Sequence, residues 1–346
     1  MKIAFIVTSL VNKGPIIVVK DIIDNLPFDW EISVYYIDDI VEVEFNKSVK
    51  FVKLDSCFKK VDFSEYDIVH SHLLRADLVS FVNRKSIRNS ISTMHSDIIK
   101  DLQISHGKAF GLMAGIIWER VVSTFSHVAF LTNVQSERYR KVIRSSVIYN
   151  GRPKPPINLV ANSDLENIKS TLQDKVILGA CANVVKRKGF EQVIDLLYSD
   201  EDNKYVFVLV GDGPDLNSLM EYAQEKNVRN RCIFFGKTNN VHEFIVSFDI
   251  FIMTSYSEGM PLALLEAASN KVPIVCSSLP VIKEVFSEDE VSFYELGNIA
   301  SLNNAVNNAV VHSTSLSSNV YIKYLHRYTD TAMSEKYQDL YITLAN

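Results

Sequence analysis

Residues 255–267 read SYSEGMPLALLEA and follow a strand-like apolar run, FDIFIM, at residues 248–253. The strand-like pattern is interrupted at Glu258 and Gly259. Pro261 then suits the first position of a helix, where its missing N–H costs nothing. A strand, a glycine turn and a helix N-terminus aim backbone N–H groups and the positive end of a helix dipole at one point. This arrangement predicts a phosphate site.

Two acids, Glu258 and Glu266, flank that predicted phosphate site. Like charges repel, so we expect both carboxylates to accept hydrogen bonds from hydroxyl groups of whatever the phosphate carries. A phosphate with hydroxyl-bearing groups on both sides is a nucleotide sugar. An isolated pair of acids at this spacing would more often be a helix N-terminal acid and a solvated helix acid.

Strand–turn–helix units recur on both sides of this stretch. The first is the apolar strand KIAFIVT at residues 2–8, followed by a loop that contains Gly14 and by helical spacing over residues 16–25. Continuous apolar strands are typical of a parallel sheet covered on both faces. No G-x-G-x-x-G follows the first strand, so it lacks a standard dinucleotide fingerprint.

The proline-rich run RPKPP at residues 152–156 is the clearest linker, and the alternation restarts after it. We therefore expect an α/β protein of two Rossmann-like, doubly wound domains that face each other across a cleft. The predicted boundaries are residues 1–152 and 157–327, with a last helix at 328–346 that packs back on the first domain. We also expect an apolar-rich helix at 106–126, a basic helix at 135–143 and one amphipathic segment at 319–344.

Composition excludes several classes of protein. Hydrophobic residues make up 47% and charged residues 22% of the 346 positions, as in an ordinary globular protein. The net charge of −5 argues against nucleic acid as the main partner. The four cysteines lack C-x-x-C spacing, which argues against a zinc or disulfide framework. No run of about 18 apolar residues predicts a membrane-spanning helix, and we expect a cytoplasmic location.

The second half resembles the retaining GT-B glycosyltransferases of family 4. Similar motifs occur in the same order: IYNG at 148–151, KRKGF at 186–190, VGDGP at 210–214, and an E-x7-E motif from Glu258 to Glu266. Two positions depart from the family's pattern. Lys13 precedes Gly14 where the family often has two glycines, and Asn183 stands where it often has an arginine.

The resemblance implies a role for each matching residue. Glu258 would bind hydroxyls of the donor sugar, and Glu266 those of the ribose. Lys188 and Arg187 would stabilise the leaving diphosphate, although a basic loop is usually just solvated. His95 would lie near the donor sugar, although a histidine at a strand end is often structural. The remaining candidates for donor binding are Gly14, Asn183, Phe235, Gly236, Lys237, Gly259, Met260, Pro261 and Leu262.

His72 either lines an acceptor pocket or caps a strand, and His70 is expected to be structural. No D-x-D sequence stands in a suitable loop, so we expect neither a metal nor another cofactor. Basic residues between 84 and 144, Arg140 and Lys141 among them, and apolar residues of the 106–126 helix suggest docking to an anionic membrane. The same residues could equally be core and solvated face.

The resemblance favours transfer of a sugar, most simply from a UDP-sugar, to a lipid-linked oligosaccharide in O-antigen, capsule or other surface polysaccharide biosynthesis. Two alternatives stay open at this point. A nucleotide-sugar epimerase shares the two-domain architecture and would convert the donor without an acceptor. A non-catalytic partner that only binds nucleotide sugars would explain the departures at Lys13 and Asn183.

Overall fold

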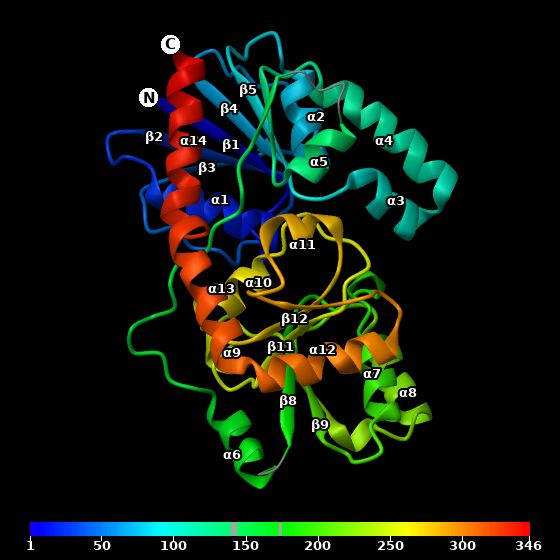
Figure 1. Ribbon diagram of the computed structural model, residues 1–346. Coiled ribbons are helices and arrows are strands. Elements are labelled where there is room, and N and C mark those ends of the chain that lie inside the picture. The colour runs from blue at the N-terminus through cyan, green and yellow to red at the C-terminus, as the bar shows by residue number, and fades with distance from the viewer. Residues whose placement is uncertain (140–143, 173–174) are drawn as a thin grey trace. The chain divides into compact units, whose positions relative to one another are not determined.

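The computed structural model describes residues 1–139, 144–172 and 175–346. The chain divides into two compact units (Figure 1). Unit 1 comprises Met1–Pro153 and Arg327–Asn346, and unit 2 comprises Lys154–His326. Each unit carries its own parallel sheet with helices around it, which confirms the predicted pair of Rossmann-like α/β domains.

In the described part of unit 1, seven strands pair in the order β3-β2-β1-β4-β5-β6-β7, and the pairings are parallel. Strand order reverses beside the central strand β1, between β1 and β4. In a doubly wound sheet ligands bind at this switch point, outside the carboxyl ends of the strands. The strands are β1 (Lys2–Val7), β2 (Glu31–Tyr36), β3 (Lys50–Lys53), β4 (Ile68–His72), β5 (Ser90–Met94), β6 (His127–Phe130) and β7 (Ser145–Val147).

The helices of unit 1 correct two predictions. The expected helix at 106–126 is wrong, because Gly107 adopts a φ of +92° and separates two helices that pack side by side (Figure 1). The basic helix expected at 135–143 begins earlier, and residues 140–143 lie outside the described residues, Arg140 and Lys141 included. The helices are α1 (Gly14–Asn25), α2 (Leu74–Val82), α3 (Ile98–His106), α4 (Lys108–Val122), α5 (Asn133–Arg138) and α14 (Asp330–Ala345).

Two glycines allow the close contact between α3 and α4. A Cβ at Gly111 would lie 2.4 Å from the backbone N of Gln103, and one at Gly115 would lie 2.3 Å from Cγ1 of Ile99. Neither distance is possible for a real side chain. The pair of glycines therefore turns one face of α4 toward α3 and leaves another face outward.

The C-terminal segment forms two helices, α13 (Ser313–Arg327) and α14, where one amphipathic segment was expected. Thr329 caps α14 by accepting a hydrogen bond from the Ala332 backbone, and this cap separates the two helices. The α14 helix belongs to unit 1. A Cβ at Gly151 would lie 2.1 Å from the Thr329 carbonyl oxygen, so this glycine lets the chain cross close to the start of α14.

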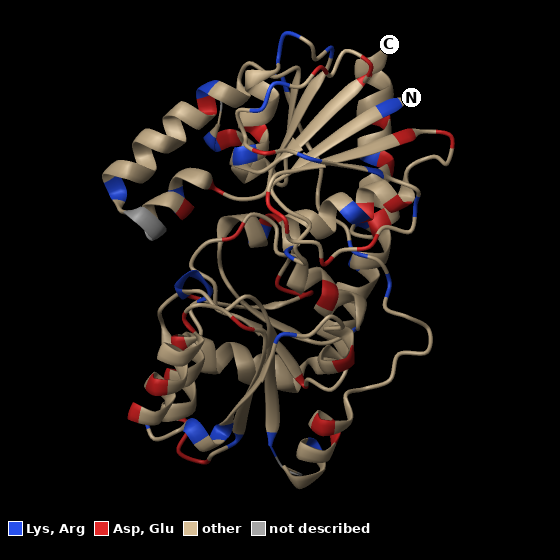
Figure 2. Ribbon diagram, turned by 180° about the vertical axis from the view of Figure 1, so that it is seen from behind, with Lys and Arg blue, Asp and Glu red and all other residues tan. Residues whose placement is uncertain are grey.

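In the described part of unit 2, six strands pair in the order β10-β9-β8-β11-β12-β13, again in parallel. The switch point lies between β8 and β11. Lys, Arg, Asp and Glu gather on helices and loops, while the strands are mostly uncharged, as expected of a sheet covered on both faces (Figure 2). The strands are β8 (Val176–Cys181), β9 (Tyr205–Val210), β10 (Cys232–Gly236), β11 (Ile250–Met253), β12 (Ile274–Ser277) and β13 (Ser292–Tyr294).

The helices of unit 2 cover both faces of this sheet (Figure 1). They are α6 (Ser163–Thr171), the 3₁₀ turn η1 (Lys186–Lys188), α7 (Glu191–Ser199), α8 (Leu216–Glu225), the 3₁₀ turn η2 (Arg229–Arg231), α9 (His242–Ile245), α10 (Leu262–Ser269), α11 (Pro280–Val285), α12 (Ile299–Val311) and α13.

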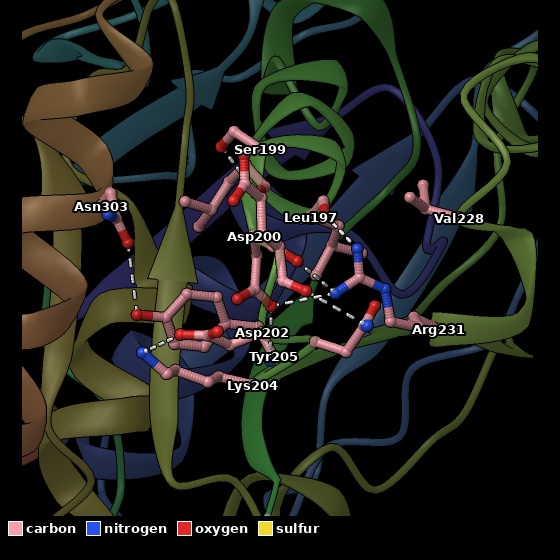
Figure 3. A network of polar contacts seen from close by, with 12 residues as sticks. Leu197, Ser199, Asp200, Asp202, Lys204, Tyr205, Val228, Arg231 and Asn303 are labelled. Carbon is pink, nitrogen blue, oxygen red and sulfur yellow. Dashed lines mark hydrogen bonds and ion pairs between the residues drawn. The ribbon is translucent and has the colours of Figure 1, made fainter.

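A polar network at the start of β9 stabilises the end of unit 2 where this strand begins (Figure 3). The Asp200 carboxylate accepts from the Tyr205 backbone N–H at 3.0 Å and from Arg231 Nη1 at 2.9 Å. Arg231 also donates to the Leu197 carbonyl, and the Tyr205 hydroxyl donates to Asn303. The network joins α7, β9, η2 and α12. Ligands of such sheets bind at the opposite, carboxyl ends of the strands, so we assign it a structural role.

Candidate functional site

Two loops of unit 2 leave the carboxyl ends of the neighbouring strands β8 and β11. Residues 182–188 follow β8, and residues 254–261 follow β11 and lead into α10. They therefore meet at the switch point of the sheet, where a doubly wound domain binds its ligand. The E-x7-E stretch, residues 255–267, and the basic loop at 186–190 come together here.

A cluster of one acid and two bases occupies the switch point. Lys188 Nζ lies 2.7 Å from Glu258 Oε1, and Arg187 Nη1 lies 3.2 Å from Glu258 Oε2. Arg187 Nη1 also donates to the Ser257 carbonyl at 2.6 Å. Both predicted cations thus reach the predicted sugar-binding acid, which lies 70 positions after Lys188 and 71 after Arg187.

The electrostatics of this cluster favour an anionic ligand. Burial by itself would raise the pKa of Glu258, but the charges of Lys188 and Arg187 outweigh it and hold that pKa below its usual value. Glu258 is therefore ionised at neutral pH. One negative and two positive charges leave an excess of one positive charge, and a carboxylate that accepts two such contacts keeps lone pairs for hydroxyl donors.

Several residues that the sequence did not single out hold these loops together. Tyr256 N donates to the Arg187 carbonyl at 2.8 Å, and Thr254 Oγ1 donates to the Lys188 carbonyl at 2.9 Å. Buried Gln192 donates to the Thr254 carbonyl and accepts from Tyr294 and the Gly297 backbone. Tyr256 lies inside the 255–267 stretch, and Thr254 and Gln192 lie beside the two motifs; this nearness is the only signal for these three in the sequence.

Gly189 ends the basic turn for two physical reasons. Its φ is +64°, and a Cβ there would lie 2.4 Å from the Thr254 carbonyl oxygen. Any side chain would push the loop after β8 away from the loop after β11. The glycine of the KRKGF motif therefore keeps Lys188 within reach of Glu258.

The glycine-rich turn at 210–214 supports the loop after β8 from the other side. A Cβ at Gly211 would lie 1.9 Å from the Ala182 carbonyl oxygen, and one at Gly213 would lie 2.2 Å from the Val184 carbonyl oxygen. Just beyond the turn, Asp215 Oδ2 accepts from the Lys186 backbone N–H at 2.7 Å. The turn therefore has a structural role, because it holds the loop after β8 in place.

The α10 helix starts one residue later than predicted. Pro261 has an extended backbone with a ψ of 121° and precedes the helix, so Leu262 is its first residue. The neighbouring Gly259 and Met260 are buried. Glu266 lies about one turn into α10. Burial raises the pKa of Cys181 at the end of β8, and the nearby charge of Glu266 raises it further. Both acids of the motif therefore lie at the switch point.

The other candidates of unit 2 lie further out. Asn183 is exposed in the loop after β8. Phe235 and Gly236 end β10, which is the edge strand two positions from β8, and exposed Lys237 follows them. Phe235 packs on Phe244 with ring centroids 5.0 Å apart. The Gly236 carbonyl accepts from Gly211 N at 2.6 Å, which links β10 to the glycine-rich turn.

Unit 1 brings its two candidate histidines together at its own switch point. His72 ends β4 and His95 follows β5, and His72 Nδ1 lies 2.8 Å from His95 Nε2. His72 is fully buried and His95 is half-buried, so His95 is the more accessible of the pair. Gly14 begins α1 in the loop after β1, the strand next to β4.

His70 has a structural setting, as expected. Its Nδ1 lies 2.7 Å from the Tyr341 hydroxyl of α14, and its Nε2 lies 2.8 Å from Thr93 Oγ1. Burial lowers the pKa of His70 and of His72 well below the usual value, and it lowers the pKa of His95 to about 3. All three rings are therefore neutral at physiological pH.

The described residues contain no group of three or more His, Cys, Asp or Glu side chains that could hold a metal ion. Among the same residues, no helix combines the length and apolar character that a membrane crossing needs.

Comparison with known proteins agrees with this geometry. Residues 163–322 match the family model described as glycosyl transferases group 1, which covers most of unit 2. The O-antigen biosynthesis glycosyltransferase WclY of Escherichia coli is 26% identical over 360 residues, with 99% of each chain covered. A UDP-Gal:alpha-D-GlcNAc-diphosphoundecaprenol alpha-1,3-galactosyltransferase of Escherichia coli is 26% identical over 355 residues, covering 89% of this chain and 86% of that protein.

Solved structures share the fold over the whole chain. Anabaena HepE in complex with UDP and glucose has a TM-score of 0.79 at 18% identity, covering 99% of this chain and 100% of that one. The lipopolysaccharide outer core galactosyltransferase WaaB in its apo form has a TM-score of 0.72 at 16% identity, with 99% of each chain covered. The two-domain architecture of this chain is therefore that of GT-B proteins.

Proposed function

Because the chain is a glycosyltransferase, we propose that it transfers a sugar, with retention of configuration, from a UDP-sugar to a lipid-linked oligosaccharide acceptor. The product would belong to O-antigen or another bacterial surface polysaccharide. The observation that carries the proposal is the cluster of Glu258, Lys188 and Arg187 at the switch point of unit 2. Support for donor and acceptor comes from the relatives, one of which is named for UDP-Gal and a diphosphoundecaprenol-linked acceptor.

Each member of the cluster has a task in this reaction. The bond between the anomeric carbon and the diphosphate breaks, and Lys188 and Arg187 stabilise the negative charge that the diphosphate takes with it. The acceptor hydroxyl forms the new bond on the same face and passes its proton to the departing phosphate oxygen. Glu258 accepts hydrogen bonds from the donor sugar, and Glu266 accepts them from the ribose.

The remaining donor contacts of unit 2 come from backbone groups around α10. Gly259, Met260 and Pro261 form the turn before this helix, and Leu262 begins it at the positive end of the helix dipole, which favours a phosphate. Phe235, Gly236 and Lys237 are proposed to bind the base, and Asn183 to contact the diphosphate. In unit 1, Gly14 and His95 are the residues proposed to meet substrate.

The cations of the cluster would stabilise the diphosphate without a metal ion. A transfer assay with purified protein, a panel of nucleotide sugars and a lipid-linked acceptor tests the proposal. We expect transfer from one donor, unchanged by a chelator. If no donor supports transfer by folded protein, the proposed reaction is wrong; if the chelator abolishes transfer, the metal-free mechanism is wrong. Conversion of the donor without acceptor would indicate an epimerase instead.

The outward face of α4 suggests how the enzyme reaches a lipid-linked acceptor. Five large apolar residues of this helix are exposed, and Lys108 and Arg120 stand on either side of them. Exposed apolar patches of this kind mark interaction sites, and flanking basic residues favour an anionic membrane on the cytoplasmic side. The five residues are Phe110, Leu112, Met113, Ile116 and Ile117.

Cosedimentation with vesicles tests this membrane contact. Vesicles that contain anionic phospholipid should bind the protein, and Met113→Ser with Ile117→Ser should weaken binding by at least about tenfold. The matched control replaces two exposed apolar residues of unit 2, Val311→Ser with Ile322→Ser, and should bind like the wild type. Equal binding of the two double variants would contradict a role for α4.

A further inference from the structure

The hydrogen bond between His72 and His95 has a direction that the surrounding residues decide. His72 Nδ1 lies 2.8 Å from His95 Nε2. The other nitrogen of His72, Nε2, is buried and has no hydrogen-bond partner among the residues that the structure describes. His72 has no exposed surface, so water does not satisfy this atom from outside.

Each neutral imidazole carries one N–H and one bare nitrogen, so the pair has two possible arrangements. In the first, His72 donates from Nδ1, and its buried Nε2 is a bare lone pair. In the second, His95 donates from Nε2, and the buried Nε2 of His72 carries a proton with no acceptor. The positions of the heavy atoms are the same in both.

The first arrangement is favoured because orphaned buried N–H groups are rarer than under-satisfied acceptors. The His70 ring, with its centroid 4.2 Å from that of His72, offers no free nitrogen, because its own two nitrogens face Tyr341 and Thr93. We infer that His72 is a positioning residue that donates from Nδ1 to His95 Nε2 and so holds the proton of His95 on Nδ1.

This tautomer decides what His95 can do. Its Nδ1 becomes a neutral N–H donor at the carboxyl edge of the sheet of unit 1, and no described residue accepts from it. A neutral ring that is protonated at its outer nitrogen cannot act there as a base. It can donate a hydrogen bond to a substrate oxygen, a hydroxyl or a phosphate, without adding a charge. The functional part of this inference rests on the proposed transfer reaction.

Nitrogen-15 NMR of the histidine-labelled full chain tests the tautomer without any substrate. The pattern of couplings between ring protons and the two ring nitrogens distinguishes the Nδ1–H form from the Nε2–H form. His72→Leu and His95→Gln assign the two rings among the eight histidines. We expect both rings to be neutral and in the Nδ1–H form. The Nε2–H form in both rings, or a doubly protonated ring at neutral pH, would overturn the inference.

Transfer assays then test the positioning role. His72→Leu should lower kcat/KM by about tenfold, the factor that corresponds to one ordinary hydrogen bond, while His72→Asn, which can still donate, should recover most of it. His127→Asn on strand β6 is the matched control and should leave activity unchanged. Wild-type activity of His72→Leu would contradict the positioning role. If the wild type transfers no sugar, the proposed function fails, and the NMR result still decides the tautomer.

Discussion

Single residues at the switch point of unit 2 have more than one task. The sequence predicted Glu258 as a ligand for sugar hydroxyls, and the structure adds that it binds Lys188 and Arg187. That second task could not be predicted from the sequence, because it depends on two loops that meet only after β8 and β11 pair. For the same reason Gln192 and Tyr256 escaped notice, although they hold those loops in place.

Glu258→Gln tests both tasks of this acid. The substitution keeps the size of the side chain but removes the charge that holds the two cations, and the amide group brings donors to face them. We expect kcat/KM for transfer to fall by about 10²- to 10³-fold, as when a group that stabilises transition-state charge is lost. Steady-state kinetics with the preferred donor give this number.

A surface acid provides the comparison for that variant. Glu221 is exposed on α8 of the same unit, and Glu221→Gln should keep wild-type kinetics. Thermal melts of both variants should show folded protein. Activity of Glu258→Gln within about threefold of the wild type would mean that the cluster stabilises no charge in the transition state.

At the scale of elements, apolar periodicity predicted the strands well and the helices less well. It located β1, predicted at residues 2–8, and β11, predicted at residues 248–253, because a buried parallel strand is a short continuous apolar run. It predicted α3 and α4 as one helix. The helix ends at Gly107 because this residue has a positive φ, and the spacing of apolar residues does not reveal the backbone conformation of a single residue. It placed Pro261 inside α10 because proline suits both the cap and the first turn.

The glycine-rich turn after β9 should tolerate no side chain at Gly211. An Ala there would place Cβ 1.9 Å from the Ala182 carbonyl oxygen, with φ at +146°. We expect Gly211→Ala to destabilise unit 2 by about 3 kcal/mol or more, from strain and overpacking together. Gly297 has a φ of +82° but open space around it, so Gly297→Ala should cost only about 1 kcal/mol. Thermal melting followed by circular dichroism compares the two, and equal losses would contradict the role of close packing.

The α14 helix should depend on its buried tyrosines for docking to unit 1. Tyr341 is fully buried, and its hydroxyl bonds His70 Nδ1, so Tyr341→Phe leaves a buried polar atom without its partner. We expect a loss of about 1–3 kcal/mol in the free energy of unfolding. The ring centroids of Trp30 and Tyr341 are 6.3 Å apart, so tryptophan fluorescence in a urea titration follows the loss of stability.

Tyr198→Phe is the matched control for that substitution. Tyr198 is 63% exposed on unit 2, and Lys226 lies over its ring, a contact that does not need the hydroxyl. The free energy of unfolding of this control, followed by circular dichroism in urea because both tryptophans belong to unit 1, should change by less than about 0.5 kcal/mol. A Tyr341→Phe variant as stable as this control would mean that the hydroxyl contributes nothing to the docking of α14.

At the scale of the whole molecule, the same rule places candidate residues in both units. The switch point between β1 and β4 carries Gly14 and His72, and the one between β8 and β11 carries Lys188 and Glu258. The sequence predicted these positions because strand order in a doubly wound domain follows from the alternation of strands and helices. The sequence could not predict which groups become buried or which groups contact each other. Burial and these contacts shift pKa values, and the shifts decide how stability responds to pH.

Two titratable groups of unit 1, one half-buried and one buried, should make stability depend on pH in opposite directions. Burial lowers the pKa of His95 in the folded chain to about 3. As pH drops below about 6.5, His95 takes up a proton in the unfolded chain before it does so in the folded chain, so this residue makes the free energy of unfolding fall. Burial raises the pKa of Asp77 to about 7, even though Ser71 and Trp118 donate to its carboxyl oxygens. This residue therefore makes stability fall as pH rises from about 4 to 7.

Difference curves between variants and wild type separate the two effects, each at most about 1.4 kcal/mol per pH unit. Relative to wild type, His95→Gln should gain stability as pH falls from 6.5 to 4.5, and Asp77→Asn should gain it as pH rises over the same range. Both tryptophans of the chain, Trp30 and Trp118, belong to unit 1, so fluorescence in urea reports on this unit alone. In the pH range between its folded and unfolded pKa values, His95 binds a proton mainly in the unfolded chain, and Asp77 binds one mainly in the folded chain. Difference curves with slopes of the same sign for His95→Gln and Asp77→Asn would therefore contradict these pKa directions.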